Sequence, residues 1–125
     1  HEVVGCSESY YYHVPRRMHR ILAHPGRSSL GSTGLRSTLL KKLENACLLN
    51  PDYIDVAFWE SIDPAARGFV DPLCVGMKGL PGRPGIGIGH RPQEGDGWSY
   101  DPGLSVLARW IGKDEVNLYQ KWLGV

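Results

Sequence analysis

The chain has 125 residues, 42% of them hydrophobic, and a net charge of +1, which is an ordinary composition for a globular protein. This length is enough for one domain with its own core, so we expect residues 1–125 to form a single domain without a stabilising metal or disulfide. No stretch approaches the roughly 18 to 20 apolar residues that cross a bilayer, and no signal peptide is visible. We therefore expect no membrane partner.

The first fifty residues predict strands followed by two helices. Valine and tyrosine dominate residues 2–14, which predicts one or two short strands. Pro15 suits the first turn of a helix that we expect to continue to His24. Residues 24–34 contain the glycine, proline and serine that are typical of a loop. The helical spacing of apolar residues then predicts a helix over residues 34–49.

A second helix and an interrupted strand are expected next. Asn50 is a good N-cap and Pro51 a good first residue for a helix over residues 51–62. The following segment, "GFVDPLCVGM", is rich in strand-forming residues but contains Pro72, so we expect a short broken strand.

The last part of the chain predicts a long loop and two helices. Glycine and proline are dense in residues 79–103, which we expect to form an ordered loop that encloses one short strand from Ile86 to His90. Apolar residues at helical spacing predict two short helices on either side of Gly112. Together these elements indicate an α+β fold with a small sheet, four or so helices and one long Gly/Pro-rich ordered loop.

Three cysteines occur at wide spacing, Cys6, Cys47 and Cys74. Their odd number and the lack of a CxxC pair argue against a disulfide framework and against a zinc site. We expect Cys6 and Cys47 to lie in the core, since the first falls in a valine-rich strand and the second in the apolar stripe of a helix. A reducing compartment such as the cytoplasm is the expected place of action.

Basic residues are concentrated in one stretch. Between Glu8 and Glu44 no acidic residue occurs, whereas seven arginines and lysines do. Such a patch is the usual footprint of a phosphate-binding surface; a solvated helix face balanced by acids elsewhere is the alternative. On the first interpretation, the residues that bind a nucleic-acid backbone are Arg16, Arg17, Arg20, Arg27, Arg36, Lys41 and Lys42.

The segment "GRPGIGIGHRPQEGDGW" presents a histidine after alternating glycines. It lacks the Lys-Ser/Thr of a P-loop and the helix that follows a dinucleotide-binding turn, so neither phosphate loop is indicated. His90 stands beside Arg91 and close to the acids Glu94 and Asp96. A histidine titrates near neutral pH and a carboxylate can fix its tautomer, so His90 is a candidate general base with Glu94 or Asp96 as its orienting acid.

A second histidine can complete a metal-free mechanism of RNA cleavage. One histidine removes the 2′-hydroxyl proton, another protonates the leaving oxygen, and an arginine stabilises the charged phosphorane. The N-terminal cluster offers His13, His19 and His24, of which we expect His19 and His24 to serve with His90 and Arg91. Ordinary surface or loop histidines are the alternative interpretation.

The segments "DVAFWESIDPAARGFVDPLCVGMKGLPGRPG" and "GHRPQEGDGWSYDPGLSVL" carry a Phe-Trp helix, a Met-x-x-Gly-like turn, a histidine and a loop. This order resembles bacterial toxin nucleases of the HNH/endonuclease VII type over residues 55–107. The resemblance implies that His90 activates water beside a metal bound by an acid such as Asp101. It departs from the family in one respect, because no further histidine follows His90.

The resemblance also implies a toxin-like domain that is delivered as part of a larger secreted protein, acts in the cytoplasm and meets a cognate inhibitor protein. The absence of Met at position 1 agrees with a domain cut from a longer chain. The acid-free basic stretch and His90 in an ordered loop lead to the main hypothesis, a nuclease that cleaves RNA rather than DNA by histidine acid–base catalysis. No metal or cofactor is expected, because the further metal-binding histidines of the family are missing.

Two other classes of function stay open. A non-catalytic binding or adaptor domain would use exposed aromatic residues as contact anchors, since Trp and Tyr are favoured at interface hot spots. A cysteine-dependent peptidase would use Cys74 with His90 as its base. The aromatic candidates for the adaptor are Trp98, Tyr100, Trp110 and Trp122.

Overall fold

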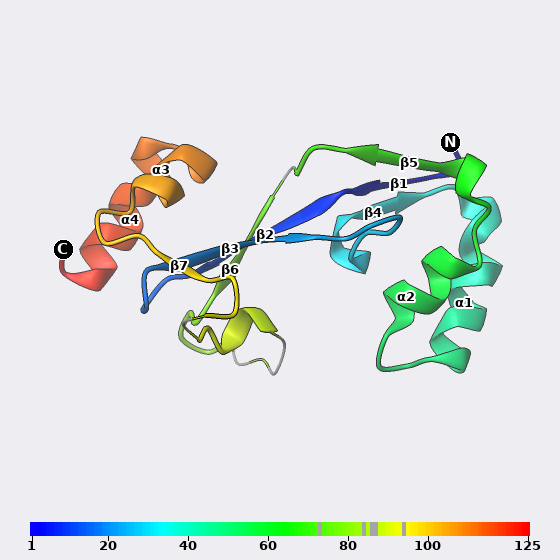
Figure 1. Cartoon of the computed structure of the whole chain (residues 1–125), viewed down its shortest axis with the longest axis horizontal. Coiled ribbons are helices and arrows are strands. Elements are labelled where there is room, and N and C mark those ends of the chain that lie inside the picture. Colours follow the sequence, from blue (N-terminus) through cyan, green and yellow to red (C-terminus); the bar gives the residue numbers. More distant parts are fainter. Residues whose placement is uncertain (73, 84, 86–87, 94) are drawn as a thin grey trace. The chain divides into compact units, whose positions relative to one another are not determined.

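The computed structural model confirms the α+β class (Figure 1). Its described residues form two mixed sheets, of three and four strands, together with four α-helices. Two compact units divide the chain: unit 1 contains residues 1–9 and 23–74, and unit 2 contains residues 10–22 and 75–125. The units interleave in sequence, so neither is a continuous segment. The structure describes residues 1–72, 74–83, 85, 88–93 and 95–125.

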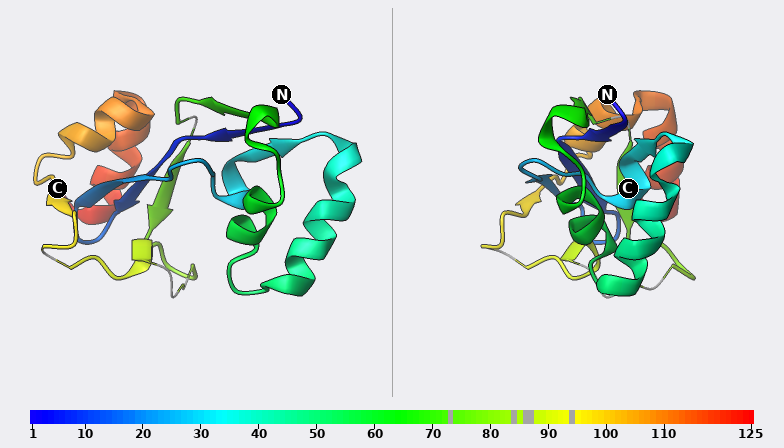
Figure 2. Two further views of the ribbon diagram at one scale, coloured as in Figure 1. Left: turned by 45° about the vertical axis from the view of Figure 1, so that its right-hand side comes forward. Right: turned by 90° about the vertical axis from the view of Figure 1, so that its right-hand side faces the viewer.

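The sheet of unit 1 has the strand order β4-β1-β5. β1 (Val3–Cys6) lies in the centre, antiparallel to β4 (Thr33–Leu35) and parallel to β5 (Arg67–Val70). A parallel pair needs a long connection between its strands. That connection includes α1 (Leu40–Leu49) and α2 (Ile54–Glu60), which pack against each other (Figure 2).

The core of unit 1 includes residues of β1, α1 and α2. Phe58 and Trp59 of α2 are fully buried with Val3 of β1, and Trp59 Nε1 donates to Thr33 Oγ1 at 3.3 Å.

The helix predicted over residues 34–49 starts later in the structure than expected. Gly34 and Leu35 pair with β1 in the sheet, a 3₁₀ turn follows at Ser37–Leu39, and α1 starts only at Leu40. The helix predicted over residues 51–62 is confirmed in type as the shorter α2.

The sheet of unit 2 has the strand order β6-β2-β3-β7. β2 (Glu8–His13) runs parallel to β6 (Val75–Lys78), and β3 (Met18–Ala23) runs antiparallel to β7 (Ser99–Tyr100). The helix predicted from Pro15 to His24 is thus wrong, because Met18–Ala23 is a strand. Sheet partners lie on both sides of β3, and their pairing outweighs the helical spacing of its apolar residues.

The helices of unit 2, α3 (Ser105–Ile111) and α4 (Lys113–Leu123), confirm the predicted pair that turns at Gly112, where φ is +98°. They pack together, and Leu107 of α3 and Val116 of α4 join Tyr12 of β2 in a common core. Trp110 contacts the rings of both Tyr12 and Tyr10. The face of β2 that carries Tyr10 and Tyr12 therefore packs against α3.

Asp101 connects this core to the start of α3. Its carboxylate accepts hydrogen bonds from the backbone N–H groups of Ser105, Val106 and Leu107, from the Ser105 hydroxyl, and from the Tyr12 hydroxyl at 3.1 Å. Burial alone would raise the pKa of Asp101, but these hydrogen bonds outweigh it and hold the pKa below its ordinary value. Asp101 is thus an ionised buried cap for α3.

The predicted glycine-rich loop contains a 3₁₀ turn, η4 (Ile88–His90), rather than a strand at residues 88–90. Residues 86 and 87 of the expected strand lie outside the described residues. The short strand β7 was not predicted. It forms because its residues pair with Met18 and His19 of β3, which are distant in sequence.

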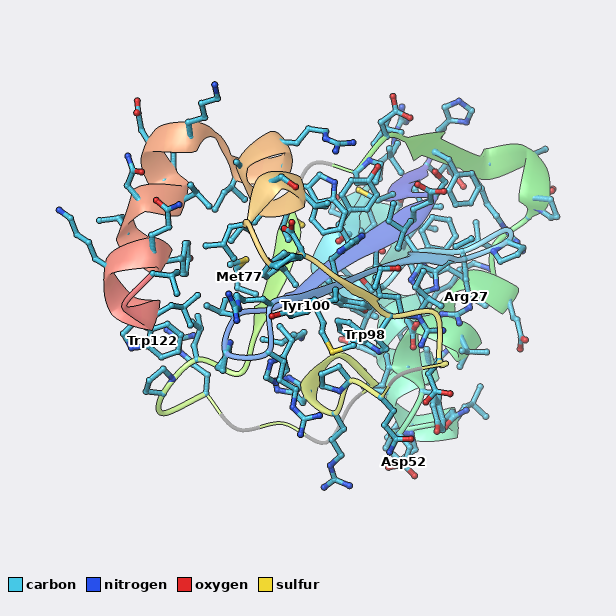
Figure 3. All side chains as sticks on the ribbon, turned by 60° about the vertical axis from the view of Figure 1, so that its left-hand side comes forward. Arg27, Asp52, Met77, Trp98, Tyr100 and Trp122 are labelled. Carbon is cyan, nitrogen blue, oxygen red and sulfur yellow. The ribbon has the colours of Figure 1, made fainter. Side chains whose placement is uncertain are left out.

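The predicted burial of two cysteines and the exposure expected of the aromatic contact anchors each hold in part. Cys6 is buried as expected, whereas Cys47 is exposed on α1, because Ala46 rather than Cys47 faces the core. Trp98 is buried, while Tyr100 and Trp122 are exposed (Figure 3). Among the described residues, no helix has the length and apolar character that a bilayer crossing demands.

Candidate functional site

The two units carry opposite charge. Unit 2 holds nine arginines and lysines and five acids, while unit 1 holds five and eight, so their formal charges are +4 and −3. One of the five acids of unit 2, Asp101, is buried and bound to α3. The excess of positive charge makes unit 2 the better place to look for an anion-binding site.

The register of two parallel strands places a histidine beside a lysine in unit 2. His13 is the partner of Lys78 where β2 and β6 end, and Tyr11 is the partner of Gly76 two residues earlier. Side chains at alternate positions share a face of a strand. Tyr11, His13 and Lys78 therefore lie on the face of the sheet opposite to Tyr12, and Lys78 Nζ lies 5.3 Å from the centroid of the Tyr11 ring.

The turn η4 adds His90 to this pair. A Cβ on Gly89 would come within 2.9 Å of Lys78 Cε, so the lysine stem packs directly on the backbone that precedes His90. The His90 ring in turn covers the open face of Gly85. His90 is half-buried and lines a pocket of 540 Å³ beside β6. Gly85 and Gly89 thus allow the close approach of the His90 and Lys78 side chains to this loop.

Both histidines are biased toward their neutral form. Burial, followed by the charges of Arg16 and His90, lowers the pKa of His13 below 6.5. Partial burial and the Lys78 charge lower the pKa of His90 in the same direction. The charge of His90 thus disfavours protonation of His13, and the charge of Lys78 disfavours protonation of His90.

Backbone contacts fix the orientation of His13. The backbone N–H of Arg16 donates to His13 Nδ1 at 3.4 Å, which places the ring proton of the neutral form on Nε2. Gly79, with φ of +74°, lies against the other side of this ring, and a Cβ there would approach His13 Cε1 to 2.5 Å. The ring is thereby held with Nε2–H as a donor. We call His13, Lys78 and His90 the unit 2 triad.

Family models, curated proteins and solved structures contain no match to this chain. The site is thus characterised by its own geometry.

The other two histidines of the predicted mechanism occupy different surroundings. His24 belongs to unit 1, where it is buried and its Nε2 shares a hydrogen bond of 2.9 Å with Ser9 Oγ. His19 lies on β3 with its ring edge-on to Trp110 at 5.5 Å, and its Nδ1 is buried without a partner among the described residues. His19 thus lies against an aromatic ring rather than on the open face of a helix.

Arg91 is exposed directly after His90, whereas Glu94, its predicted acidic neighbour, lies outside the described residues. Asp101, the metal ligand that the resemblance implies, instead has both carboxylate oxygens engaged in hydrogen bonds to Tyr12 and α3. No group of three His, Cys, Asp or Glu in the described part of the chain is arranged to hold a metal ion.

The seven predicted phosphate-binding residues are divided between the units: three belong to unit 2 (Arg16, Arg17 and Arg20) and four to unit 1 (Arg27, Arg36, Lys41 and Lys42). Those of unit 1 are largely engaged: Arg27 pairs with Asp55 at 2.7 Å, Lys41 pairs with Glu44 at 3.1 Å, and Lys42 donates to the Ser61 carbonyl. The Arg36 side chain is exposed and has no hydrogen bond or ion pair with the residues that the structure describes.

In unit 2, three arginines of the basic stretch contact nearby loops. Arg16 donates to the Pro92 carbonyl, which follows Arg91, and Arg17 donates to the Pro102 carbonyl and lies over the Tyr100 ring. Arg20 lies against Gly97. Arg16 is the member of the stretch that adjoins the triad, through its backbone bond to His13.

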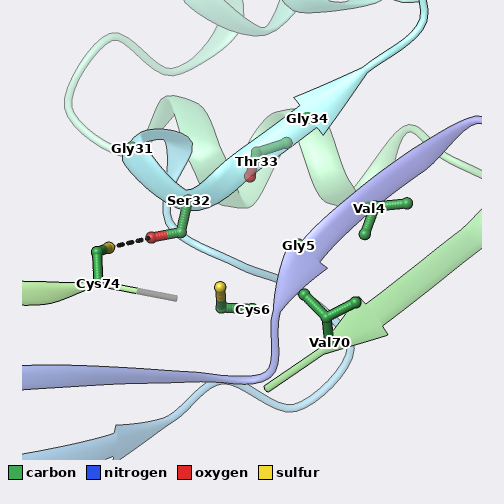
Figure 4. A pocket seen from close by; sticks show the side chains of 9 residues that line it. All are labelled: Val4, Gly5, Cys6, Gly31, Ser32, Thr33, Gly34, Val70 and Cys74. Atoms are coloured by element: carbon green, nitrogen blue, oxygen red, sulfur yellow. Dashed lines mark hydrogen bonds between the residues drawn. The ribbon is translucent and has the colours of Figure 1, made fainter. Parts of the chain in front are cut away.

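Unit 1 has a pocket of its own, which is lined by two of the three cysteines, Cys6 and Cys74 (Figure 4). Cys6 Sγ donates to the Asp71 carbonyl, and Cys74 Sγ lies 3.8 Å from Ser32 Oγ. The remaining lining is small or apolar, with no histidine among the described residues that form it. His90, the expected base for a cysteine nucleophile, belongs to unit 2, whereas Cys74 belongs to unit 1.

Sequence reasoning singled out His90 but missed Lys78 and gave no site role to His13. Their proximity depends on parallel pairing between segments about sixty residues apart. The one available signal was the pair of strand patterns that end in a histidine and in "GMKG". Nothing in those patterns specifies that the two strands are neighbours.

Proposed function

We propose that this protein cleaves the phosphodiester backbone of RNA without a metal, using the unit 2 triad. The observation that carries the proposal is the convergence of His13, Lys78 and His90 at one end of the β2–β6 pair. Two histidines with an adjacent ammonium group supply acid–base chemistry and charge stabilisation, which together suffice for this reaction.

His90 is the general base. Its lowered pKa keeps its imidazole neutral near pH 7, and its position in the pocket leaves it accessible to a ribose. It accepts the proton of the 2′-hydroxyl while the 2′-oxygen attacks phosphorus. A new P–O2′ bond forms as the P–O5′ bond breaks, which gives a 2′,3′-cyclic phosphate.

His13 and Lys78 act on the other side of the phosphate. Nε2–H of His13 donates to a non-bridging oxygen, where negative charge grows in the transition state. The Lys78 ammonium gives a proton to the departing 5′-oxygen, and solvent restores it while His90 releases its own proton. Arg16 and Arg91 add positive charge that attracts the polyanion.

The decisive experiment is incubation of the pure protein with single-stranded RNA in EDTA, with 2′-deoxy substrate as a chemical control. We expect cleavage of RNA alone and a 2′,3′-cyclic product. His90→Ala should lose activity, and His1→Ala, an exposed histidine of unit 1, should not. Cleavage that disappears in EDTA would instead favour the metal-dependent mechanism of the HNH resemblance, and no cleavage in any condition would favour a binding domain.

A further inference from the structure

The pocket beside β6 has a mostly apolar lining. Arg83 and His90 are its polar members. β6 is the terminal strand of its sheet, so no described strand covers its outer edge. The pocket encloses 540 Å³, within the roughly 300–1,000 Å³ that small-molecule sites occupy. Its apolar lining comprises Val75, Met77, Leu80 and Pro81.

We infer that this pocket holds the nucleobase of the nucleotide next to the cleaved phosphate. The inference rests on the proposed function, because His90 lines the same pocket and would face the ribose of that nucleotide. A nucleobase is flat and mostly apolar on its faces, and it is attached to an anion. The pocket offers apolar lining together with one cationic side chain, Arg83.

The lining side chains suit such an occupant individually. Met77 (labelled in Figure 3) has a polarisable thioether that packs well on aromatic rings. Arg83 is exposed, so its planar guanidinium is accessible to stack on a base or to bind a phosphate. Leu80 is half-buried and supplies an aliphatic contact without a polar group that selects one base. The site therefore favours nucleotides broadly over sugar phosphates.

Binding of two matched anions measures the contribution of the base. Adenosine 5′-monophosphate and ribose 5-phosphate carry the same sugar and phosphate, and they should be titrated separately in EDTA by calorimetry. We expect the nucleotide to bind about tenfold more tightly to the wild-type protein, since tenfold corresponds to one well-packed apolar contact. Leu80→Ala should remove most of this advantage and leave ribose 5-phosphate binding unchanged.

Arg83→Ala and Leu118→Ala complete the test. Arg83 is exposed, so its replacement leaves the core intact, and it should weaken nucleotide binding even if Leu80→Ala destabilises the fold. Leu118 is 68% exposed on α4 and serves as the apolar control, with no expected change. Equal affinity for both anions, or nucleotide binding that is insensitive to both Leu80 and Arg83, would overturn the inference.

The outcomes separate this inference from the proposed function. If RNA cleavage depends on His13 and His90 but the nucleotide has no advantage over ribose phosphate, the pocket is wrong and the triad stands. If the nucleotide advantage depends on Leu80 but RNA is never cleaved, the pocket is a nucleotide site and the catalytic proposal fails.

Discussion

The two units contain the same kinds of structural elements, but their buried histidines have different neighbours. Each has a mixed sheet, a parallel strand pair, two helices and a buried histidine whose pKa is lowered. In unit 1 His24 is bonded to Ser9, and both ion pairs recorded among the described residues belong to this unit. In unit 2 His13 lies beside another histidine and a lysine. Basic residues that form ion pairs with acidic residues stabilise the fold. Basic residues that cluster without acidic neighbours leave a positive charge that attracts anions.

This difference also shows why the density of basic residues in sequence is a poor guide to a site. The acid-free stretch from Arg16 to Lys42 is shared between the units, and its unit 1 members Arg27 and Lys41 have acidic partners. Lys78 lies outside the stretch but adjoins His13 through strand pairing and packs on the backbone that precedes His90. Topology, rather than sequence density, determines which charges converge.

The largest expected effect on RNA cleavage is the difference between replacing Lys78 in unit 2 and replacing Lys41 in unit 1. Lys78→Ala should reduce RNA cleavage roughly 100-fold or more, because it removes the group that protonates the leaving oxygen. Lys41→Ala, which breaks an exposed ion pair in unit 1, should stay within about twofold of wild type. Single-turnover rates on one RNA substrate measure both. Equal losses would show that the lysines act only as general surface charge.

A change at Gly79 should act through the position of His13. Alanine there must adopt φ near +74° and would crowd His13 Cε1, so Gly79→Ala should lower cleavage about tenfold and destabilise the fold by ~1–2 kcal/mol. Gly31→Ala in unit 1 has open space around its Cβ and should change neither quantity much. The measurements are the rate of RNA cleavage at subsaturating substrate and the midpoint of thermal unfolding. If Gly79→Ala cleaves RNA as fast as the wild-type protein, Gly79 does not fix the position of His13.

Asp101→Asn should destabilise unit 2 by ~2–3 kcal/mol, because it weakens hydrogen bonds to a buried charge. The folded pKa of Asp101 is lowered, so its contribution is present above the unfolded value of about 3.9 and is lost as pH falls through the folded pKa. Denaturant unfolding at pH 7 and at pH 3 tests this. The difference from wild type should shrink at the lower pH, and a constant difference would contradict the account.

The smallest effect concerns the Arg27–Asp55 pair of unit 1. Its side chains are 34% and 24% exposed, so Arg27→Ala should cost less than about 1 kcal/mol in stability. Cleavage should be unchanged, although the sequence places Arg27 among the phosphate-binding residues. The cleavage rate and the denaturant midpoint of Arg27→Ala should both be compared with those of the wild-type protein. A loss of cleavage without a loss of stability would show that unit 1 takes part in substrate binding.

Local patterns predicted some elements of this fold well and others poorly. The apolar spacing around Gly112 predicted α3 and α4, because each helix buries one stripe of its own residues. The segment Met18–Ala23 has a similar spacing but forms β3, since strands remote in sequence supply its hydrogen bonds. The candidate site follows the same rule. His90 was identifiable from its neighbours, whereas His13 and Lys78 meet only through the β2–β6 register.

The most direct test of a site in unit 2 is the pH dependence of kcat/KM for RNA cleavage in EDTA. For the wild-type protein we predict a rise with a midpoint below pH 6.5, because His90 must lose its proton, and its partial burial and the Lys78 charge both lower its pKa. Lys78→Met should move the residual activity to a higher midpoint, and His24→Ala should leave the midpoint in place. A midpoint that moves with His24 and not with Lys78 would contradict the account.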